Sequence, residues 1–445
     1  MSPGRRQCLR AAWAGWAAAS AAPSLAAGPA ATASAAHAHA HAHAHAQPAP
    51  TSATPPAPLP GAADDRIQRG RPLAFPRDHG AHNGARIEWW YATGWLQAPN
   101  ASAAPLFGFQ LTFFRRRTGL AENLAGRFAP QQLLFAHAAV TDVAGRQHRH
   151  AERLARWSGD PAWPEAHAQR GDTAITLGRW TLHRQPGVAS RSSGASSSSA
   201  TSANSGFSGS SGFSDNSGNG AHYSARLAAP EAGFTLDLQL QPTQPLLLQG
   251  VAGYSRKGPQ PQHASHYYSQ PQLAVQARLT LDGQTRTLPG RGWLDHEWSD
   301  ELLAPGVVGW DWIGINLADG GALTAFQLRG ADDQVVWAGG SHRPAAGAVR
   351  DWAPAEVVFT PQRHWTSPAT GARYPVQWRI ETPAGRFELK ALLDAQELDS
   401  RASTGTVYWE GLAELLDAHG QRRGLGYLEM TGRAQPLRLG LGLGL

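Results

Sequence analysis

Short stretches in which apolar and polar residues alternate recur along most of the chain, separated by turn residues. Alternation over about five to ten residues is typical of a β-strand with one buried face. The pattern predicts strands at residues 87–96, 105–114, 133–142, 173–183, 234–240, 273–281, 309–317, 322–329, 335–339, 376–381, 386–393, 406–415 and 424–431. Turn pairs such as Asp282-Gly283 and Asp319-Gly320 lie between them. Patterns of long amphipathic helices are missing, so we predict an all-β fold with two barrels or two sandwiches.

Length and composition fit two domains. The chain has 445 residues, which is enough for two sizeable cores, and its 49 glycines and 32 prolines favour turn-rich β structure. We place the first domain at residues 65–250 and the second at residues 251–435. Residues 189–221 are almost purely Ser, Gly and Asn, which predicts a flexible insertion in the first domain. Residues 436–445 form a predicted tail.

Residues 1–26 are predicted to be an export signal of the twin-arginine type. The pair Arg5-Arg6 precedes an apolar stretch rich in Ala and Trp, and small residues that suit cleavage follow near Ala26. The single cysteine, Cys8, lies inside this segment, so the mature chain is expected to have no disulfide and no thiolate metal site. We therefore expect a periplasmic or secreted protein that is exported in folded form. A retained N-terminal anchor is the alternative.

The segment 27–64 is rich in Ala, Pro and His and is predicted to be a disordered linker. Histidines alternate with alanine from His37 to His45, so an extended chain would present them on one side, where they can capture Zn, Ni or Cu. A neutral, solvated tail is the interpretation that we favour. We predict no catalytic metal and no cofactor.

Charge and motif content argue against several function classes. The chain carries 39 basic and 33 acidic side chains, and its longest basic run is Arg115-Arg116-Arg117. A nucleic-acid-binding protein usually gathers its basic residues in one patch, and no such patch is evident in this sequence. We therefore expect no nucleic-acid partner. The sequence contains no Gly-x-Ser-x-Gly elbow, no P-loop, no Rossmann glycine motif and no His-Glu-x-x-His motif. Serine-hydrolase, nucleotide and zinc-protease chemistry are therefore not indicated.

Tryptophan stands beside a carboxylate in four separate blocks. They are Glu88-Trp89-Trp90-Tyr91, Gly292-Trp293-Leu294-Asp295-His296-Glu297-Trp298, Gly309-Trp310-Asp311-Trp312 and Tyr408-Trp409-Glu410-Gly411. Buried acids are costly in a structural core, but they suit an apolar cavity that holds a few of them. We predict ligand contacts from Glu88, Trp90, Glu297, Trp310, Trp312 and Trp409. For Glu88 the alternative is a buried ion pair with Arg86 or Arg329.

Asp295 is the candidate general acid. Strand alternation places Trp293 and Asp295 on one face, and it likewise places His266 and Tyr268 on one face of an earlier strand. These two faces are predicted to line one cavity. A dry aromatic setting keeps a carboxyl protonated at neutral pH, so that it can protonate an alkene while ring faces stabilise the cation. The alternative is a buried salt-bridged network that closes a barrel.

Taken in order, seven blocks resemble one protein family. They are Phe75-Pro76-x-Asp78-His79-Gly80-x-His82, Glu88-Trp89-Trp90-Tyr91-x-Thr93-Gly94, His266-Tyr267-Tyr268-Ser269, Gly292-Trp293-Leu294-Asp295-His296-Glu297-Trp298-Ser299, Gly309-Trp310-Asp311-Trp312, Tyr408-Trp409-Glu410-Gly411 and Gly426-Tyr427-Leu428-Glu429-Met430-Thr431-Gly432. The pattern resembles the AttH-type and hydroxyneurosporene-synthase (carotenoid 1,2-hydratase) family of lipocalin-like proteins, from about residue 70 to residue 432. The resemblance implies two tandem lipocalin-like β-barrel domains and a large apolar cavity near their junction.

The resemblance also implies roles for individual residues. In the hydratase branch a His, two aromatic residues and an Asp act on an isolated C=C bond, and the corresponding positions here are His266, Tyr268, Trp293 and Asp295. Asp295 would donate the proton, the two aromatic residues would stabilise the cation, and His266 would position water or carry the proton onward. This predicts a cofactor-free hydratase of a hydrophobic isoprenoid or lipid.

A binding protein is the second functional reading. The Asp-His-Glu-Trp sequence at residues 295–298 is closer to the exported AttH-type branch of the family. The alternative prediction is therefore a non-enzymatic periplasmic protein that binds a lipid or another hydrophobic ligand. Its partner would be a membrane transporter of the ABC type in the cell envelope.

Overall fold

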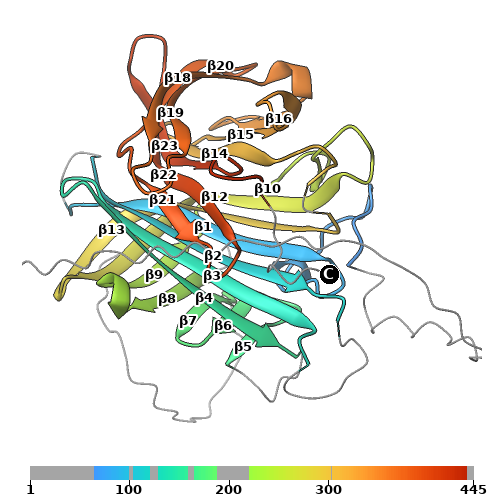
Figure 1. Ribbon diagram of the computed structural model, residues 1–445, viewed down its shortest axis with the longest axis vertical. Helices are drawn as coiled ribbons and strands as arrows, with labels where there is room; N and C mark the ends of the chain where they lie inside the picture. Colours follow the sequence, from blue (N-terminus) through green and yellow to red (C-terminus); the bar gives the residue numbers. More distant parts are fainter. Residues whose placement is uncertain are drawn as a thin grey trace, which may run out of the picture. The chain divides into compact units, whose positions relative to one another are not determined.

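The fold is almost entirely β, as the alternation of apolar and polar residues predicts. The computed structural model describes residues 65–99, 104–120, 129–158, 165–187, 220–301 and 303–437. Two sheets account for the strands in these ranges, and they lie one above the other in Figure 1, where sheet B is orange to red. The predicted export signal, the linker and nearly all of the Ser/Gly insertion lie outside the described residues.

Sheet A has thirteen antiparallel strands in the described part of the chain. Its spatial order is β4-β3-β2-β1-β13-β12-β9-β8-β7-β6-β5, and β10 and β11 pair with β12. The strands are β1 (Ile87–Gln97), β2 (Pro105–Arg117), β3 (Gln132–Asp142), β4 (Gln147–Trp157), β5 (Ala166–Ala168), β6 (Ala174–Leu177), β7 (Trp180–Gln185), β8 (His222–Ala229), β9 (Phe234–Gln241), β10 (Leu247–Leu248), β11 (Tyr254–Arg256), β12 (Ala264–Leu281) and β13 (Gln284–Ser299). Because β5 and β6 also pack against β4, the sheet curls into a nearly closed barrel around an apolar core.

Sheet B has ten antiparallel strands among the described residues. Its order is β17-β16-β15-β14-β23-β22-β20-β19-β18, with β21 paired to β22. The strands are β14 (Gly309–Leu317), β15 (Ala322–Arg329), β16 (Val335–Arg343), β17 (Arg350–Trp352), β18 (Val358–Thr366), β19 (Arg373–Thr382), β20 (Gly385–Ala391), β21 (Glu397–Ser400), β22 (Thr406–Leu416) and β23 (Arg422–Met430). This sheet surrounds a second apolar core. The predicted architecture of two tandem lipocalin-like barrels is therefore confirmed.

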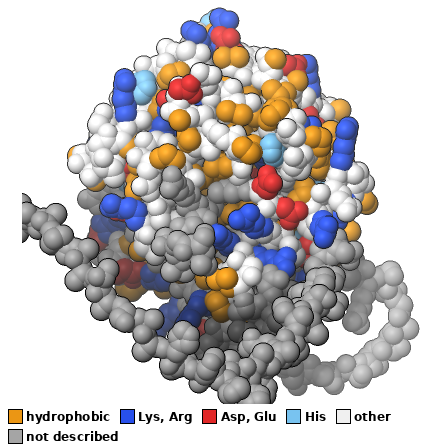
Figure 2. Space-filling view, turned by 45° about the vertical axis from the view of Figure 1, so that its right-hand side comes forward, with side chains coloured by type: hydrophobic (Ala, Val, Ile, Leu, Met, Phe, Trp, Pro, Cys, Tyr) orange, Lys and Arg blue, Asp and Glu red, His pale blue; other side chains and the backbone are white. Residues whose placement is uncertain are grey.

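Helical structure in the described ranges is limited to three single turns. These 3₁₀ helices are η1 (Arg77–His79), η2 (Pro230–Ala232) and η3 (Pro354–Glu356). None of the helices in these ranges is long and apolar enough to span a membrane. On the face drawn in Figure 2, basic, acidic and apolar side chains are interspersed.

The division between the sheets falls later in the chain than the predicted division at residue 250. Strand β12 pairs with β9, and β13 pairs with both β12 and β1, so residues up to Ser299 belong to sheet A. Sheet B begins at Gly309. The two long strands are needed in sheet A because they connect β1 to β9 and so complete the first barrel. Strands β7 and β8, which flank the Ser/Gly insertion, are paired neighbours.

Burial patterns show which strands lie between the two sheets. In β9 only alternate residues are buried, as expected of a strand with one face in water. In β1 and β22 nearly every residue is buried, because β1 contacts β23 and β2 contacts β22 across the junction. In these strands, one set of side chains points into the core of its own barrel and the other set points toward the opposite sheet. Side chains are therefore buried at the junction between the sheets as well as in the two barrel cores.

A bulge in β12 fixes how the sheets meet. The pairing of β12 with β13 shifts between Gln270 and Leu273, and Gln272 adopts a left-handed backbone with φ of 56°. This conformation directs the Gln272 backbone N–H to Asn316 Oδ1 at 2.7 Å and its side-chain amide to the Leu317 carbonyl at 2.9 Å. Such buried hydrogen bonds between β12 and β14 hold the two sheets in a defined relative position.

Candidate active site

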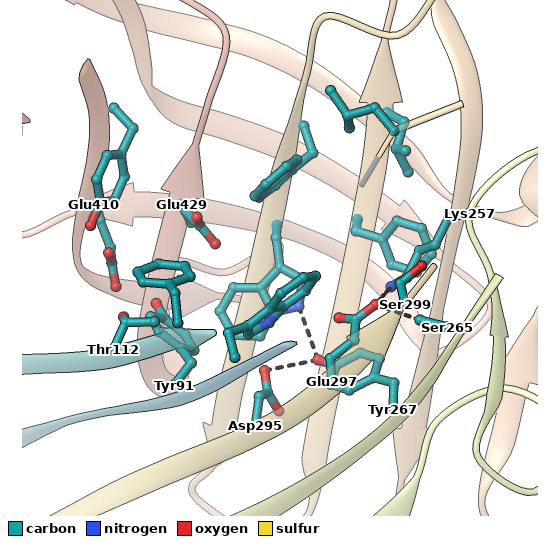
Figure 3. A pocket seen from close by; sticks show the side chains of 18 of the residues that line it. Tyr91, Thr112, Lys257, Ser265, Tyr267, Asp295, Glu297, Ser299, Glu410 and Glu429 are labelled. Atoms are coloured by element: carbon teal, nitrogen blue, oxygen red, sulfur yellow. Dashed lines mark hydrogen bonds and ion pairs between the residues drawn. The ribbon is translucent and has the colours of Figure 1, made fainter. Parts of the chain in front are cut away.

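The candidate active site is a pocket between the two sheets, shown in Figure 3. It has a cavity volume of about 90 Å³, whereas a single water needs only about 10–15 Å³ by this kind of measure. The pocket can therefore hold a ligand much larger than water. Most of its lining comes from β1, β2, β12, β13, β14, β15, β22 and β23, and the rest from the segments beside β11 and β13. The lining residues are Trp89, Tyr91, Thr112, Phe114, Lys257, Ser265, Tyr267, Asp295, Glu297, Ser299, Glu301, Leu303, Trp310, Trp312, Phe326, Leu328, Tyr408, Glu410 and Glu429.

Asp295 lies on the sheet A wall of this pocket and is 3% exposed. The Tyr267 hydroxyl donates to its Oδ2 at 2.8 Å, and the Trp293 indole N–H donates to its Oδ1 at 2.7 Å. Burial raises the pKa of Asp295, and these hydrogen bonds offset only part of the effect, so the pKa reaches about 7. The carboxyl is therefore an acid that holds its proton up to neutral pH, as predicted for a dry aromatic setting.

Glu297 is the next inward-facing acid on β13, and it has a cationic partner. Lys257 Nζ lies 3.1 Å from its Oε1, and the Ser265 hydroxyl donates to the same oxygen at 2.5 Å. The lysine ammonium also lies over the Tyr267 ring, 4.7 Å from its centroid, and over the Phe326 ring at 4.4 Å. The protein thus already places one cation between aromatic faces and a carboxylate in this half of the pocket.

Two further acids, Glu410 on β22 and Glu429 on β23, face the pocket from sheet B (Figure 3). They are directly opposite each other in the strand pairing. Burial and then the charge of Glu429 raise the pKa of Glu410 well above its ordinary value. Burial also raises the pKa of Glu429 to about 7, and the charge of Asp295 adds to this shift. The pocket therefore has acidic groups on both walls that hold protons near neutral pH.

Aromatic rings form much of the remaining lining. The indole N–H of Trp312 donates to the Tyr267 hydroxyl at 3.3 Å, which extends the chain of hydrogen bonds that begins at Asp295. The Trp312 ring also packs edge-on against Tyr91 at 5.5 Å and against Trp293 at 6.4 Å. Trp310 and Trp312 line the pocket, as Glu297 does. These three predicted ligand contacts therefore lie together with Asp295.

The predicted tetrad of His266, Tyr268, Trp293 and Asp295 is divided by sheet A. Tyr268 is paired with His296, whereas Asp295 is paired with Ser269, so even-numbered and odd-numbered residues of the two strands point to opposite faces. Tyr268 instead contacts His79 Nδ1 through its hydroxyl at 2.8 Å, on the face away from the pocket. Tyr267 takes the place that was predicted for Tyr268. The prediction that one cavity contains all four residues is wrong.

Glu88 and Trp90 also face away from the pocket, because β1 presents Trp89 and Tyr91 to it. Glu88 forms the buried ion pair that was the alternative for this residue. Its Oε2 accepts from Arg115 Nε at 2.7 Å, so the partner is neither Arg86 nor Arg329. Burial raises the pKa of Glu88, but the charges of Arg115 and His82 outweigh burial and hold the pKa well below its ordinary value. Glu88 is thus a structural anion.

The donor atoms of His82, Glu88 and His296 lie within 4.8 Å of one another, a spacing that a metal ion could use. Glu88 Oε1 instead accepts from His82 Nδ1 at 2.7 Å and from His296 Nε2 at 2.9 Å. His82 Nε2 bonds to Asp78 Oδ1 at 3.0 Å. Burial lowers the pKa of His82, but Glu88 and Asp78 together raise it above its ordinary value. Because an imidazolium has no lone pair for a metal, these residues fit a hydrogen-bonded network better than a metal centre.

Trp409 points into the core of the second barrel and does not line the pocket. It is fully buried, and its indole N–H donates to the Asp394 carbonyl at 2.6 Å. Its neighbours Tyr408 and Glu410 lie on the opposite face of β22 and do line the pocket. Sequence reasoning missed Tyr91, Tyr267, Glu410 and Glu429 as site residues. Alternation along β1 puts Tyr91 on the face opposite Glu88 and Trp90, so that residue could have been found from the sequence. The pairing of β22 with β23 is needed to bring Glu410 and Glu429 together.

Comparison with known protein families shows to which family the chain belongs. The AttH-like family model matches residues 66–208 and 211–433. The chain belongs to the AttH-like family. A solved structure of a Nitrosomonas europaea protein assigned to AttH is 41% identical, with a TM-score of 0.68, and the match covers 83% of this chain and 99% of that one. The predicted membership of the lipocalin-like AttH family is thus confirmed.

A more distant structure shares the fold of this AttH-like chain. Kievitone hydratase from Nectria haematococca is 13% identical, with a TM-score of 0.54, and the match covers 81% of this chain and 92% of that one. At this identity the likeness extends to the fold alone. No curated protein sequence matches the chain.

Proposed function

We propose that this AttH-like protein is a hydro-lyase that adds water to a C=C bond of a hydrophobic, isoprenoid-like molecule. The observation that carries the proposal is Asp295, a buried carboxyl with a pKa of about 7 that faces an aromatic-lined pocket. A general acid works best when its pKa lies near the operating pH. Asp295 meets this condition, and hydrogen bonds connect it to Tyr267 on its own wall and, through Tyr267, to Trp312 of sheet B.

The reaction balances with the groups that surround the pocket. The carboxyl of Asp295 gives its proton to one alkene carbon, and the π electrons form the new C–H bond. The cation left on the other carbon is stabilised by the faces of Trp310, Trp312 and Tyr267. A water molecule then adds to the cation and returns a proton to the Asp295 carboxylate, which restores the acid. The net change is alkene plus water to alcohol, and no oxidant or reductant is needed.

The fold is compatible with this chemistry but does not assign it. Kievitone hydratase has the same fold, which supports the proposal only at the level of architecture. The assignment of the reaction rests on the acid and the aromatic rings in this chain. The metal-like cluster at His82, Glu88 and His296 is not used, because it lies on the other face of sheet A.

The experiment is hydration of isoprenoid alkenes in water enriched with oxygen-18, with products detected by mass spectrometry. Asp295→Asn keeps the shape of the side chain but removes the acidic proton, and we expect a loss of at least about a hundredfold in rate. Asp237→Asn on β9 is the matched control, because Asp237 is a half-exposed partner of Arg226 outside the pocket. Equal turnover by wild type and Asp295→Asn would refute the role of Asp295.

Binding of a hydrophobic ligand without turnover is the second candidate. It is favoured by the same aromatic lining, which can hold an unsaturated lipid whether or not a proton is transferred. Such a carrier would deliver its ligand to a membrane transporter of the cell envelope. Lipids that co-purify with the native protein and remain unchanged on incubation would support the carrier over the hydro-lyase.

We also propose export in folded form through the twin-arginine signal at Arg5-Arg6. This proposal is supported by the sequence pattern and by the single cysteine inside the signal. Replacement of both arginines by lysine should stop accumulation in the periplasm. Unchanged accumulation of the double-lysine variant would exclude this route.

A further inference from the structure

The sheet B half of the pocket contains a pair of acids that the proposed reaction does not use. Glu410 and Glu429 are directly opposite on neighbouring antiparallel strands, a geometry that places their Cβ atoms about 4.5–5.5 Å apart. Like charges at such a position destabilise a sheet. Burial of two ionised carboxylates side by side is unfavourable, so the pair favours a state in which it retains a proton or receives a positive charge from outside.

Two polar atoms at this pair have room for a further partner. Glu410 Oε1 and the Tyr91 hydroxyl are buried and interact with each other electrostatically, but neither makes a hydrogen bond of ordinary length and angle among the described residues. Glu410 is 2% exposed and Tyr91 is 5% exposed, and both line the pocket. A buried polar group without a well-formed hydrogen bond is costly, because it has given up its hydrogen bonds with water. A ligand group that donates hydrogen bonds at this place would remove that cost.

The other half of the pocket shows which group suits this chemistry. There the Lys257 ammonium lies between the Tyr267 and Phe326 rings and 3.1 Å from the carboxylate of Glu297. The sheet B half offers carboxyls and aromatic rings of the same kind, but Lys257 is the only cationic side chain in the described lining. The lining contains five acidic side chains, so its acids outnumber its cations. The acids of the sheet A half thus have the Lys257 ammonium group beside them, whereas Glu410 and Glu429 in the sheet B half have no cationic side chain in the described lining.

We propose that Glu410, Glu429 and Tyr91 bind the protonated amine of a hydrophobic ligand. The proposal rests on the proposed function for the assignment of this pocket as the substrate site, and it adds an amine to the substrate class. An ammonium group supplies hydrogen-bond donors to Glu410 and Tyr91 and a charge that the carboxyl pair can share. Its apolar body would then lie along the tryptophans toward Asp295. A divalent metal ion fits less well, because it needs six or more oxygen ligands or waters, which aromatic walls do not supply.

Binding of three probes of equal length tests the proposal by calorimetry at neutral pH. The probes are hexylamine, 1-hexanol and hexanoate, which differ only in a cationic, neutral or anionic head. We expect wild type to bind hexylamine at least about tenfold more tightly than 1-hexanol, from charge-assisted hydrogen bonds and cation–π contact. We expect hexanoate to bind more weakly than both. Equal affinity for hexylamine and 1-hexanol would overturn the proposal, as would displacement of hexylamine by Mg²⁺ or Ca²⁺.

Two variants and a control locate the amine. Glu410→Gln should lower hexylamine affinity at least about tenfold and leave 1-hexanol affinity unchanged. Lys257→Met should raise hexylamine affinity, because it frees Glu297 for a second ammonium group. Glu414→Gln is the control, because Glu414 lies on β22 like Glu410 but outside the pocket lining. It should change neither the hexylamine affinity nor the 1-hexanol affinity. Hexylamine affinity that is equal in wild type and Glu410→Gln would refute the assignment.

The outcome is separable from that of the hydration experiment. The calorimetric assay needs no turnover, and Asp295→Asn should retain the preference for hexylamine over 1-hexanol because it leaves Glu410 and Glu429 in place. Failure of hydration with a retained amine preference would refute the reaction but not the ligand class. Hydration of neutral alkenes without any preference for hexylamine would refute the amine proposal and leave the proposed reaction standing.

Discussion

The Asp295→Asn variant should flatten the pH dependence of folding stability. Burial raises the pKa of Asp295 from 3.8 to about 7 in the folded protein. The unfolded chain releases this proton at lower pH than the folded protein does, so stability is lost as the pH rises from the unfolded pKa through the folded pKa. By linkage, the carboxyl costs roughly 1.5 kcal/mol at about pH 5 and roughly 4 kcal/mol at about pH 8.

Urea unfolding followed by tryptophan fluorescence at these two pH values measures the effect. Relative to Asp295→Asn, wild type should lose roughly 2.5 kcal/mol of stability between about pH 5 and about pH 8. The asparagine also changes the hydrogen bonds with Tyr267 and Trp293, but this effect is the same at both pH values and cancels. Asp237→Asn is the control and should parallel wild type. If the difference between wild type and Asp295→Asn does not change with pH, Asp295 is not a neutral buried acid and the reasoning fails.

Three further variants test separate parts of the structure. Glu88→Gln should destabilise the protein by about 3–5 kcal/mol, because Arg115 stays buried without its anion; an unchanged urea midpoint would argue against a structural ion pair. Tyr267→Phe removes a hydrogen bond to Asp295 and should raise the pKa of that carboxyl, which infrared titration detects; a lower pKa would contradict this. Trp312→Leu keeps the cavity apolar but removes a ring, so hydration should fall about tenfold; full turnover would show that this ring does not stabilise the cation.

Strand positions were predictable wherever one face or both faces are apolar. The predicted strands at residues 309–317 and 322–329 agree with β14 and β15. Strand β4 (Gln147–Trp157) was missed, because its sequence is rich in His and Arg and it is largely half-buried at one end of the strand order. In the first part of β12, polar and aromatic residues are buried on both faces, so alternation of apolar and polar residues does not define the limits of the strand there. The sequence placed His266 and Tyr268 on one face of a strand but did not give its extent.

The candidate site was predictable within each strand but not between strands. Alternation along β13 puts Asp295 and Glu297 on one face, and both line the pocket. Which face of β12 they share depends on the pairing register, and a shift of one residue exchanges Tyr267 for Tyr268. The bulge after Gln270 sets that register, and no sequence pattern reveals it. The same limit applies to the Glu410 and Glu429 pair, which only the register of β22 and β23 brings together.

The most direct test of the account is the protonation state of Asp295 in the folded protein. Infrared difference spectra between wild type and Asp295→Asn isolate the C=O stretching band of this one carboxyl as the pH is changed. The account predicts a protonated-carboxyl band that is present at about pH 6 and disappears with a midpoint near neutral pH, in line with the pKa of about 7. A band that is already absent at about pH 6 would mean an ionised Asp295, which cannot protonate an alkene, and would contradict the central claim.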